Sequence, residues 1–359
     1  MPEFFGCLME KFDSITHFMQ SGEFEYRVFD MGRKLVSISN GDFENIENQV
    51  TAYPYPFQQK AWLALLFWSK NKKKEPVIWF LQFPIDEMGY LKQDARDGFL
   101  ISLLEQAGKN IQAKLSGGSV VDELSESPYA FKPQEDRLAL FHAFASKVLN
   151  HKPSRYYQAT LEYLSGRLGF DQWQFLGLQG IADVVANLNK NDNEAVLTKA
   201  IPSLPDIPLG SFCRALENIE LKGDLVQALI TKLEQTLEKN NPDELLLQSM
   251  ILRSLSGAGP KKLKQKMLLT VLNSLIGREI EILAAISGRS WQDLHSTSIL
   301  DAFMRNLAMQ DQTAFNAILT DLMLIPGMRE VVRGQLRGSH GKGELAHKLG
   351  AFMLELKSK

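Results

Sequence analysis

The chain has 359 residues, of which 45% are hydrophobic and 23% are charged, and its formal net charge is −2. This profile is that of an ordinary soluble globular protein, and it disfavours a general nucleic-acid binder, which needs an excess of basic residues. Two cysteines, Cys7 and Cys213, are too few for a disulfide framework or a cysteine-based zinc site and fit a reducing compartment. The length predicts two domains, or one domain followed by a repeat array.

No segment of the sequence is typical of export or of membrane insertion. The amino-terminal segment MPEFFGCLMEKFDS contains Glu3 and has no basic stretch ahead of an apolar run, unlike a secretory signal. The most apolar runs, such as AWLALLFW, are far shorter than the ~20 residues that span a bilayer. We therefore expect a cytoplasmic protein that is not inserted in a membrane.

The first third of the chain is typical of a mixed α and β domain. Residues 24–38 hold two short, partly alternating apolar runs around a turn-like segment, 30–33, which predicts a β-hairpin. Two further apolar runs, within 54–70 and 75–83, do not alternate, so each is expected to be covered on both faces. Residues 62–68 fit a buried helix as well as a strand, because periodicity does not separate the two.

A helix and then a linker are expected after these runs. Beyond Gly89, apolar residues recur at intervals of three and four along one helical face. They are Phe99, Leu100, Leu103, Leu104, Ala107 and Ile111. Residues 116–136 mix Gly, Ser, Pro and acidic residues without a period, which is typical of a linker. We therefore expect an α+β domain over residues 1–115, with an antiparallel sheet of about four strands backed by helices.

From residue 137 to residue 359 the chain is predicted to be almost wholly helical. Helix breakers and caps recur mostly sixteen to eighteen residues apart, which is the length of one helix and a short loop. Two such helices make a unit of roughly 33 to 36 residues, the size of a helical repeat. The signatures of named repeats are absent, so we expect a degenerate, HEAT-like helical-repeat array, with an irregular helical bundle as the alternative.

A group of acidic residues follows the last apolar run and is the first candidate site. Asp86 and Glu87 lie at a predicted turn, and Asp94 and Asp97 lie one helical turn apart beside Arg96. Carboxylates grouped in this way can bind a hard cation. Each acid also has a structural explanation, because Asp suits a turn and acids stabilise the first turn of a helix. No Asp-x-Asp-x-Asp-Gly loop is present, so the structural interpretation is favoured.

A second candidate interaction surface is basic. Lys261, Lys262, Lys264 and Lys266 lie at a predicted helix start, where positive charge opposes the helix dipole. Such a patch suggests an acidic partner. The absence of interleaved aromatic residues disfavours nucleic acid as that partner.

No motif predicts a cofactor, a metal ion or a catalytic group. The six histidines lack paired ligand spacing, and no G-x-S-x-G sequence occurs. Segment 333–348 looks like a phosphate loop, but Leu336 stands where the first glycine of that loop is needed. We therefore expect neither a cofactor nor an enzymatic site.

The segments YPYPFQQKAWLALLFW and EPVIWFLQFPIDEMGYLKQDARDGFL together resemble a family of uncharacterised gammaproteobacterial proteins catalogued as domain of unknown function 3549. The resemblance lies in the Tyr-Pro-x-Pro opening, the Trp-Phe-Leu-x-Phe-Pro strand end, the Asp-Glu-x-Gly turn and the Arg-Asp-x-Phe-Leu helix start. It implies a bacterial cytoplasmic protein and brings no activity or ligand.

These observations predict a non-enzymatic scaffold or adaptor that binds another protein, because stacked helical repeats present extended surfaces to macromolecules. One alternative is an enzyme or small-ligand binder with a site between the two parts near Asp86 and Glu87. A third is weak nucleic-acid binding through the patch from Lys261 to Lys266. The sequence does not predict an oligomeric state.

Overall fold

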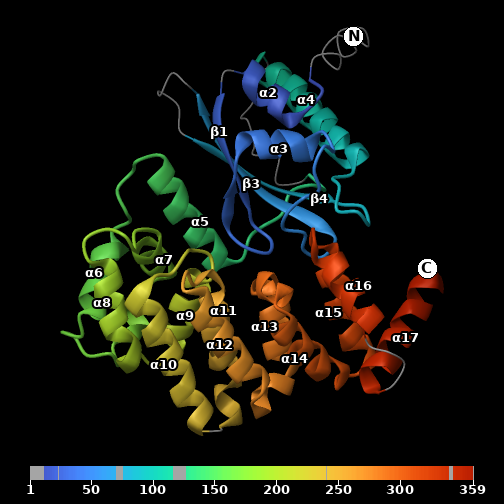
Figure 1. The fold of residues 1–359 in the computed structure, drawn as a ribbon. Helices are drawn as coiled ribbons and strands as arrows, with labels where there is room; N and C mark the ends of the chain where they lie inside the picture. The colour runs from blue at the N-terminus through green and yellow to red at the C-terminus, as the bar shows by residue number, and fades with distance from the viewer. Residues whose placement is uncertain are drawn as a thin grey trace. The chain divides into compact units, whose positions relative to one another are not determined.

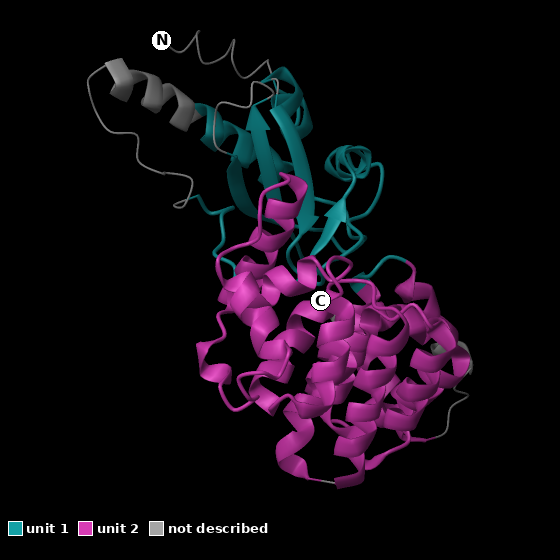
Figure 2. Ribbon diagram, turned by 90° about the vertical axis from the view of Figure 1, so that its left-hand side faces the viewer, with its two compact units in different colours: residues 1–133, 324–326 teal, residues 134–323, 327–359 magenta. Residues whose placement is uncertain are grey.

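The computed structural model describes residues 12–22, 24–69, 76–115, 127–239, 241–338 and 343–358. It divides into two compact units, which Figure 2 shows in different colours. Unit 1 comprises residues 1–133 and 324–326, and unit 2 comprises residues 134–323 and 327–359. Most of the expected linker, residues 116–126, lies outside the described residues, as does the amino-terminal segment 1–11.

A four-stranded antiparallel sheet forms the centre of unit 1 (Figure 1). Its strands are β1 (Phe24–Asp30), β2 (Val36–Ile38), β3 (Lys60–Ser69) and β4 (Val77–Pro84), in the order β2-β1-β3-β4. Val28 of β1 lies opposite both Ile38 of β2 and Leu65 of β3, and Leu65 lies opposite Trp79 of β4. The predicted hairpin and the predicted small antiparallel sheet are confirmed.

The central strand β3 is the segment whose conformation the sequence left open. It pairs with β1 on one edge and with β4 on the other, so its backbone hydrogen bonds are made on both sides. Leu63 and Leu65 belong to the main core of the unit, and the intervening Ala64 and Leu66 are buried as well. Because both faces are covered, β3 shows no alternation, although Ala and Leu favour helices in isolation.

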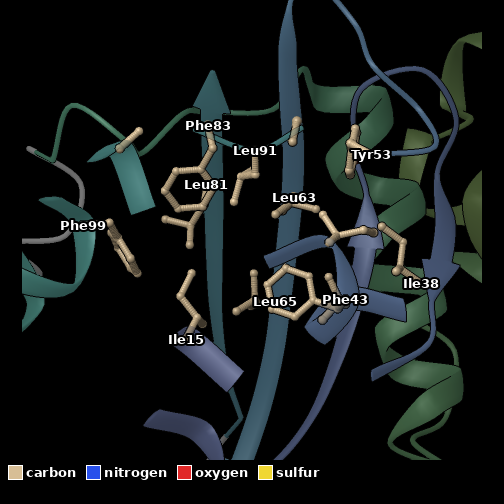
Figure 3. Close-up of a cluster of buried hydrophobic side chains, with 14 of the residues drawn as sticks. Ile15, Ile38, Phe43, Tyr53, Leu63, Leu65, Leu81, Phe83, Leu91 and Phe99 are labelled. Atoms are coloured by element: carbon tan, nitrogen blue, oxygen red, sulfur yellow. The ribbon is translucent and has the colours of Figure 1, made fainter. Parts of the chain in front are cut away.

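Three helices pack against one face of this sheet. They are α2 (Ile15–Ser21), α3 (Asn40–Glu47) and α4 (Gln93–Leu115). Figure 3 shows side chains from the helices and strands meeting in one apolar cluster, with Ile15, Phe43 and Phe99 facing Leu63, Leu65 and Phe83. The helix predicted after Gly89 is confirmed as α4.

Helix α3 was not predicted, although a local signal for it is present. The Ser39 hydroxyl oxygen accepts a hydrogen bond from the backbone N–H of Asp42, and the same hydroxyl donates to the Asp42 carboxylate. This reciprocal cap is a variant of the Ser-x-x-Glu capping box. The helix is only eight residues long and depends on Phe43 and Ile46 reaching the core, which local sequence does not reveal.

Part of the expected linker belongs to the sheet. Residues 127–131 run beside β4, where the N–H of Gln82 donates to the carbonyl of Tyr129 and the N–H of Phe131 donates to the carbonyl of Phe80. The Tyr129 ring packs against Phe83. The stretch 127–131 therefore protects the outer edge of β4, although its composition is that of a loop.

Unit 2 is helical throughout its described residues. Its α-helices are α5 (Glu135–Val148), α6 (Tyr156–Leu164), α7 (Leu178–Ala186), α8 (Asn193–Ala200), α9 (Asp206–Leu216), α10 (Gly223–Lys239), α11 (Leu245–Ser254), α12 (Lys261–Leu272), α13 (Ile280–Arg289), α14 (Thr297–Ala308), α15 (Gln312–Leu324), α16 (Met328–Gly338) and α17 (Glu344–Ser358). The helical character predicted from residue 137 is confirmed, and the first helix begins at Glu135. No helix in the described ranges has the length and apolar character that crossing a membrane requires.

Alternate helices of unit 2 pack against one another. Helix α5 contacts α7, α7 contacts α9, α9 contacts α11, and α11 contacts α13. Likewise α6 contacts α8, α8 contacts α10, and α12 contacts α14. Figure 1 shows these helices following one another along the unit. The chain thus returns to the same row after each intervening helix.

The loops after α9 and α11 approach each other closely through their backbones. The N–H of Leu221 donates to the carbonyl of Gly257, and the N–H of Gly259 donates to the carbonyl of Leu221. A Cβ atom at residue 257 would lie 2.0 Å from the carbonyl oxygen of Ile219. Only glycine fits here, because the obstacle is backbone and not a side chain that can turn away.

We expect Gly257→Ala to lower the free energy of unfolding by roughly 2 kcal/mol or more, since the two loops must separate. The matched control is Gly288→Ala in α13, where nothing lies within 4 Å of the added Cβ. That change should be neutral or stabilise by up to about 1 kcal/mol through helix propensity. Urea unfolding followed by circular dichroism compares the two, and equal effects would contradict the close approach.

Candidate functional site

The first predicted acid, Asp86, organises a turn. Its Oδ1 atom accepts hydrogen bonds from the backbone N–H groups of Met88 and Tyr90, each at 2.9 Å. Gly89 adopts a φ of +87° in this turn and donates its N–H to the carbonyl of Asp86. Asp commonly closes turns in this way. The neighbouring Glu87 is exposed.

The other predicted acids lie on α4. Asp94 is exposed in the first turn, where a negative charge stabilises the helix. The guanidinium of Arg96 donates to Asp97 at 2.6 Å and to the backbone carbonyl of Glu47 at 3.2 Å. Arg96 is buried, and its guanidinium reaches from α4 to the last residue of α3. Across the residues that the structure describes, no group of three His, Cys, Asp or Glu could hold a metal ion.

One of the four lysines of the predicted patch does not lie on the surface. Lys264 is buried, and its Nζ atom lies 2.6 Å from Asp293 Oδ2 and donates to the carbonyl of Ser256 at 2.6 Å. It shares the buried face of α12 with Met267 and Leu268, which is why it cannot point outward with the rest of the patch. Lys261, Lys262 and Lys266 are exposed.

Buried polar groups in unit 1 serve the fold. Glu47 ends α3, and its carboxylate accepts the backbone N–H groups of Ile15 and Thr16 at the start of α2. Burial raises the pKa of Glu47, although these hydrogen bonds oppose the shift. Asp30 accepts the hydroxyl of Tyr53 at 2.5 Å and the N–H of Lys34 at 2.8 Å. These carboxylates satisfy backbone and hydroxyl donors in the core and are not accessible to a ligand.

A different group of side chains, in unit 2, was not predicted from the sequence. The carboxylate of Glu217 is 2% exposed and faces three guanidinium groups. Arg253 donates to both of its oxygens, from Nε to Oε2 at 2.7 Å and from Nη2 to Oε1 at 3.0 Å. Arg289 Nε donates to Oε1 at 3.0 Å, and Arg137 Nη2 lies 3.7 Å from Oε1. We call these four residues the Glu217 cluster.

The Glu217 cluster joins the ends of four helices. Glu217 follows the last residue of α9, Arg253 lies next to the end of α11, and Arg289 ends α13. The carboxyl ends of these three helices therefore lie together, and the helices run in the same direction. Arg137 comes from the first turn of α5, so the amino end of that helix meets them. Arginine is favourable at the carboxyl end of a helix because of the helix dipole.

The charges in the cluster are unequal. Burial acts to raise the pKa of Glu217, but Arg289, Arg253 and Arg137 outweigh it and hold that pKa below its usual value. Burial lowers the pKa of Arg289 to about 10, against the attraction of Glu217. One ionised carboxylate thus faces three guanidinium groups. The adjacent pair of Asp136 and Arg214, 3.3 Å apart, adds no net charge.

A signal for this cluster was present in the sequence. Glu217, Arg253 and Arg289 are spaced 36 residues apart, which matches the upper size of the expected repeat. An alignment of successive 36-residue segments places Glu217, Arg253 and Arg289 at equivalent positions. Arg137 has no such signal, because its distance of 80 residues from Glu217 fits no multiple of this period.

One comparison places the chain among known sequences. The family model described as Protein of unknown function (DUF3549) matches residues 10–353. The chain belongs to this family. The resemblance noted for segments 53–68 and 75–100 is thereby confirmed, and the match extends through both units. The curated proteins and the solved structures that were compared contain no match.

A polar cavity of about 190 Å³ lies elsewhere in unit 2, between α5, α6 and α7. Two of its charged side chains hold the surrounding turns. Asp183 accepts the N–H of Ser154 at 2.9 Å, and Lys147 donates to the carbonyl of Ala186 at 2.9 Å. The residues that line this cavity are different from those of the Glu217 cluster.

We expect Asp86→Ala to lower the free energy of unfolding by about 1–2 kcal/mol, because two backbone N–H groups lose their acceptor. Asp94→Ala, the matched control, removes only a favourable charge at a helix start and should cost about 0.5 kcal/mol. Urea unfolding measures both values. An Asp86→Ala protein as stable as the wild type would contradict the structural role of this carboxylate.

We expect Glu217→Gln to destabilise the protein by about 3–5 kcal/mol at neutral pH, because buried arginines lose their counter-charge. The lowered pKa makes this stabilisation fully present above pH 4.5 and lost as the pH falls through the folded-state value. The difference between variant and wild type should therefore shrink below pH 4.5. Glu234→Gln, an exposed acid on α10, should change stability by less than about 0.5 kcal/mol at any pH. A constant difference from pH 7 to pH 3 would contradict the ionised state of Glu217.

Proposed function

We propose that this protein is a non-enzymatic cytoplasmic scaffold of bacteria that binds another protein through a HEAT-like helical array. The observation that carries the proposal is the packing of alternate helices in unit 2, from α5 through α7, α9 and α11 to α13. An array of this kind presents a long surface made of equivalent positions, and such surfaces mostly bind macromolecules.

The part of the array from α9 to α13 supports this proposal most directly. Helix α9 starts at Asp206, α11 at Leu245 and α13 at Ile280, and each is followed by a helix of the other row. Ser249 Oγ donates to the carbonyl of Glu281, which places early turns of α11 and α13 side by side. The starts of these helices are 39 and 35 residues apart, which is close to the size of a helical repeat.

Three exposed apolar side chains lie at or shortly before the amino ends of these helices. Ile207 and Leu246 occupy the second positions of α9 and α11, and Leu275 lies in the short 3₁₀-helix Leu275–Arg278 that precedes α13. Their exposed fractions lie between 61% and 67%. A single exposed apolar side chain is ordinary, but several at the same end of neighbouring helices are typical of a contact surface. We assign the partner-binding edge to these residues.

The alternatives have less support. The carboxylate of Asp86 is occupied by two backbone N–H groups, so it is poorly suited to catalysis. Three of the four lysines between 261 and 266 are exposed, while Lys264 is buried beside Asp293. A reduced patch of three lysines on one helix is a weak basis for phosphate-backbone binding.

The test is affinity purification of the tagged full chain from its source bacterium, followed by mass spectrometry. The triple variant Ile207→Ser, Leu246→Ser and Leu275→Ser should lose the partner. The control is Val50→Ser with Met88→Ser, two side chains of unit 1 with similar exposed fractions, 65% and 62%. This control should retain the partner. Equal recovery with both variants, or recovery of no specific protein with the wild type, would contradict the proposal.

A further inference from the structure

We propose that the polar cavity between α5, α6 and α7 binds a small free α-amino acid, with the ammonium group of the ligand on the buried side and its carboxylate at the rim. This inference does not rest on the proposed scaffold function. It rests on which lining side chains are buried, which hydrogen-bonding groups lack a partner, and how opposite charges are distributed around one cavity.

The buried side of the cavity presents acceptors. Asp183 and Asn187 line it and are 2% and 7% exposed. The Asp183 carboxylate accepts one N–H of Ser154 and one of Gln179, which leaves each oxygen a second acceptor position. Asn187 donates its amide N–H to the carbonyl of Asp183, and its Oδ1 atom accepts no hydrogen bond from the residues that the structure describes. Because a buried acceptor without a donor is unfavourable, this side suits a ligand group that donates.

The backbone adds partial negative charge near the cavity. Helix α5 ends at Val148 and α7 ends at Ala186, and the last turns of both helices contribute lining residues. The carbonyl groups at the carboxyl end of a helix carry partial negative charge. Lys147 donates to the carbonyl of Ala186 at 2.9 Å and offsets part of this charge. Together with the Asp183 carboxylate, the remaining carbonyl groups favour an ammonium group over an anion on the buried side.

The rim of the cavity is positively charged. Lys147 and Lys190 both line the cavity and both are exposed. Within the described parts of the chain, the side chain of Lys190 makes no hydrogen bond or ion pair. Burial, and then the charge of Lys190, lower the pKa of Lys147, so the two ammonium groups are close enough to repel each other. A carboxylate at the rim relieves this repulsion and accepts charge-assisted hydrogen bonds from both lysines.

The distribution of charge, and not a net excess, decides the class of ligand. Two lysines oppose one carboxylate and two helix ends, so neither an anion nor a cation alone matches the whole cavity. A zwitterion matches both sides, because acceptors lie on the buried side and ammonium groups lie at the rim. The volume of about 190 Å³ holds about six water molecules at ~30 Å³ each, which limits the ligand to a small amino acid.

The experiment is isothermal titration calorimetry of the full chain at pH 7 and constant ionic strength with glycine, L-serine and L-glutamine. Two further arms use methylamine and acetate, which are glycine without its carboxylate and glycine without its ammonium group. At least one amino acid should bind saturably. Methylamine and acetate should each bind more weakly by roughly tenfold or more, because each loses the charge-assisted hydrogen bonds of one side.

A pair of lysine variants tests the rim. Lys190→Gln removes a charge that makes no contact within the protein, so the fold should be unaffected. It should weaken amino-acid binding roughly tenfold and change methylamine binding less than about twofold. Lys199→Gln, the matched control, removes an exposed lysine of α8 that does not line the cavity, and it should change neither affinity by more than about twofold.

Asp183→Asn tests the buried side. It should weaken the binding of amino acids and of methylamine alike, and circular dichroism separates this loss from loss of the fold. The proposal is overturned if none of the three amino acids binds the wild type saturably, or if acetate or methylamine binds as tightly as the amino acid. Equal binding by Lys190→Gln and Lys199→Gln would also overturn it. These outcomes do not depend on the folding of Asp183→Asn.

Discussion

A buried carboxylate imposes the strongest local constraint on unit 2. The ionised carboxylate of Glu217 is buried. Removing it from water costs desolvation free energy unless positive groups lie at hydrogen-bond distance from it. Those groups come from α5, α11 and α13, so the ends of these helices must meet the end of α9. Apolar packing alone would allow one helix to slide along another. The geometry of the Glu217 cluster removes that freedom.

The two units use buried charge in different ways. In unit 1, Glu47 and Asp30 accept backbone N–H or hydroxyl groups near them in the fold, and they are closed off by the core. In unit 2, three guanidinium groups crowd one carboxylate and part of their surface remains accessible. In unit 1 the buried carboxylates are satisfied by neighbouring donors of the same unit. The arrangement in unit 2 joins helix ends through charged side chains, whereas the carboxylate of Asp86 accepts two backbone N–H groups of its own turn.

The proposed partner-binding edge and the Glu217 cluster lie at opposite ends of the same helices. Ile207 and Leu246 lie at the amino ends of α9 and α11, whereas Glu217 and Arg253 lie at their carboxyl ends. The match to the DUF3549 family model covers residues of both units and assigns no activity to either unit. The exposed apolar side chains and the Glu217 cluster are built from different residues of these helices.

The sequence by itself determined the class of each unit, the hairpin of β1 and β2, the helix α4 and the helical character of the second unit, because these depend on local periodicity, caps and turns. The sequence also contains the 36-residue spacing of Glu217, Arg253 and Arg289, although the cluster itself was not predicted from it. Only the tertiary structure decided that residues 60–69 form a central strand, that 127–131 joins the sheet, and that Lys264 turns inward to Asp293. Each of these outcomes depends on partners distant in the chain, whose positions local sequence does not contain.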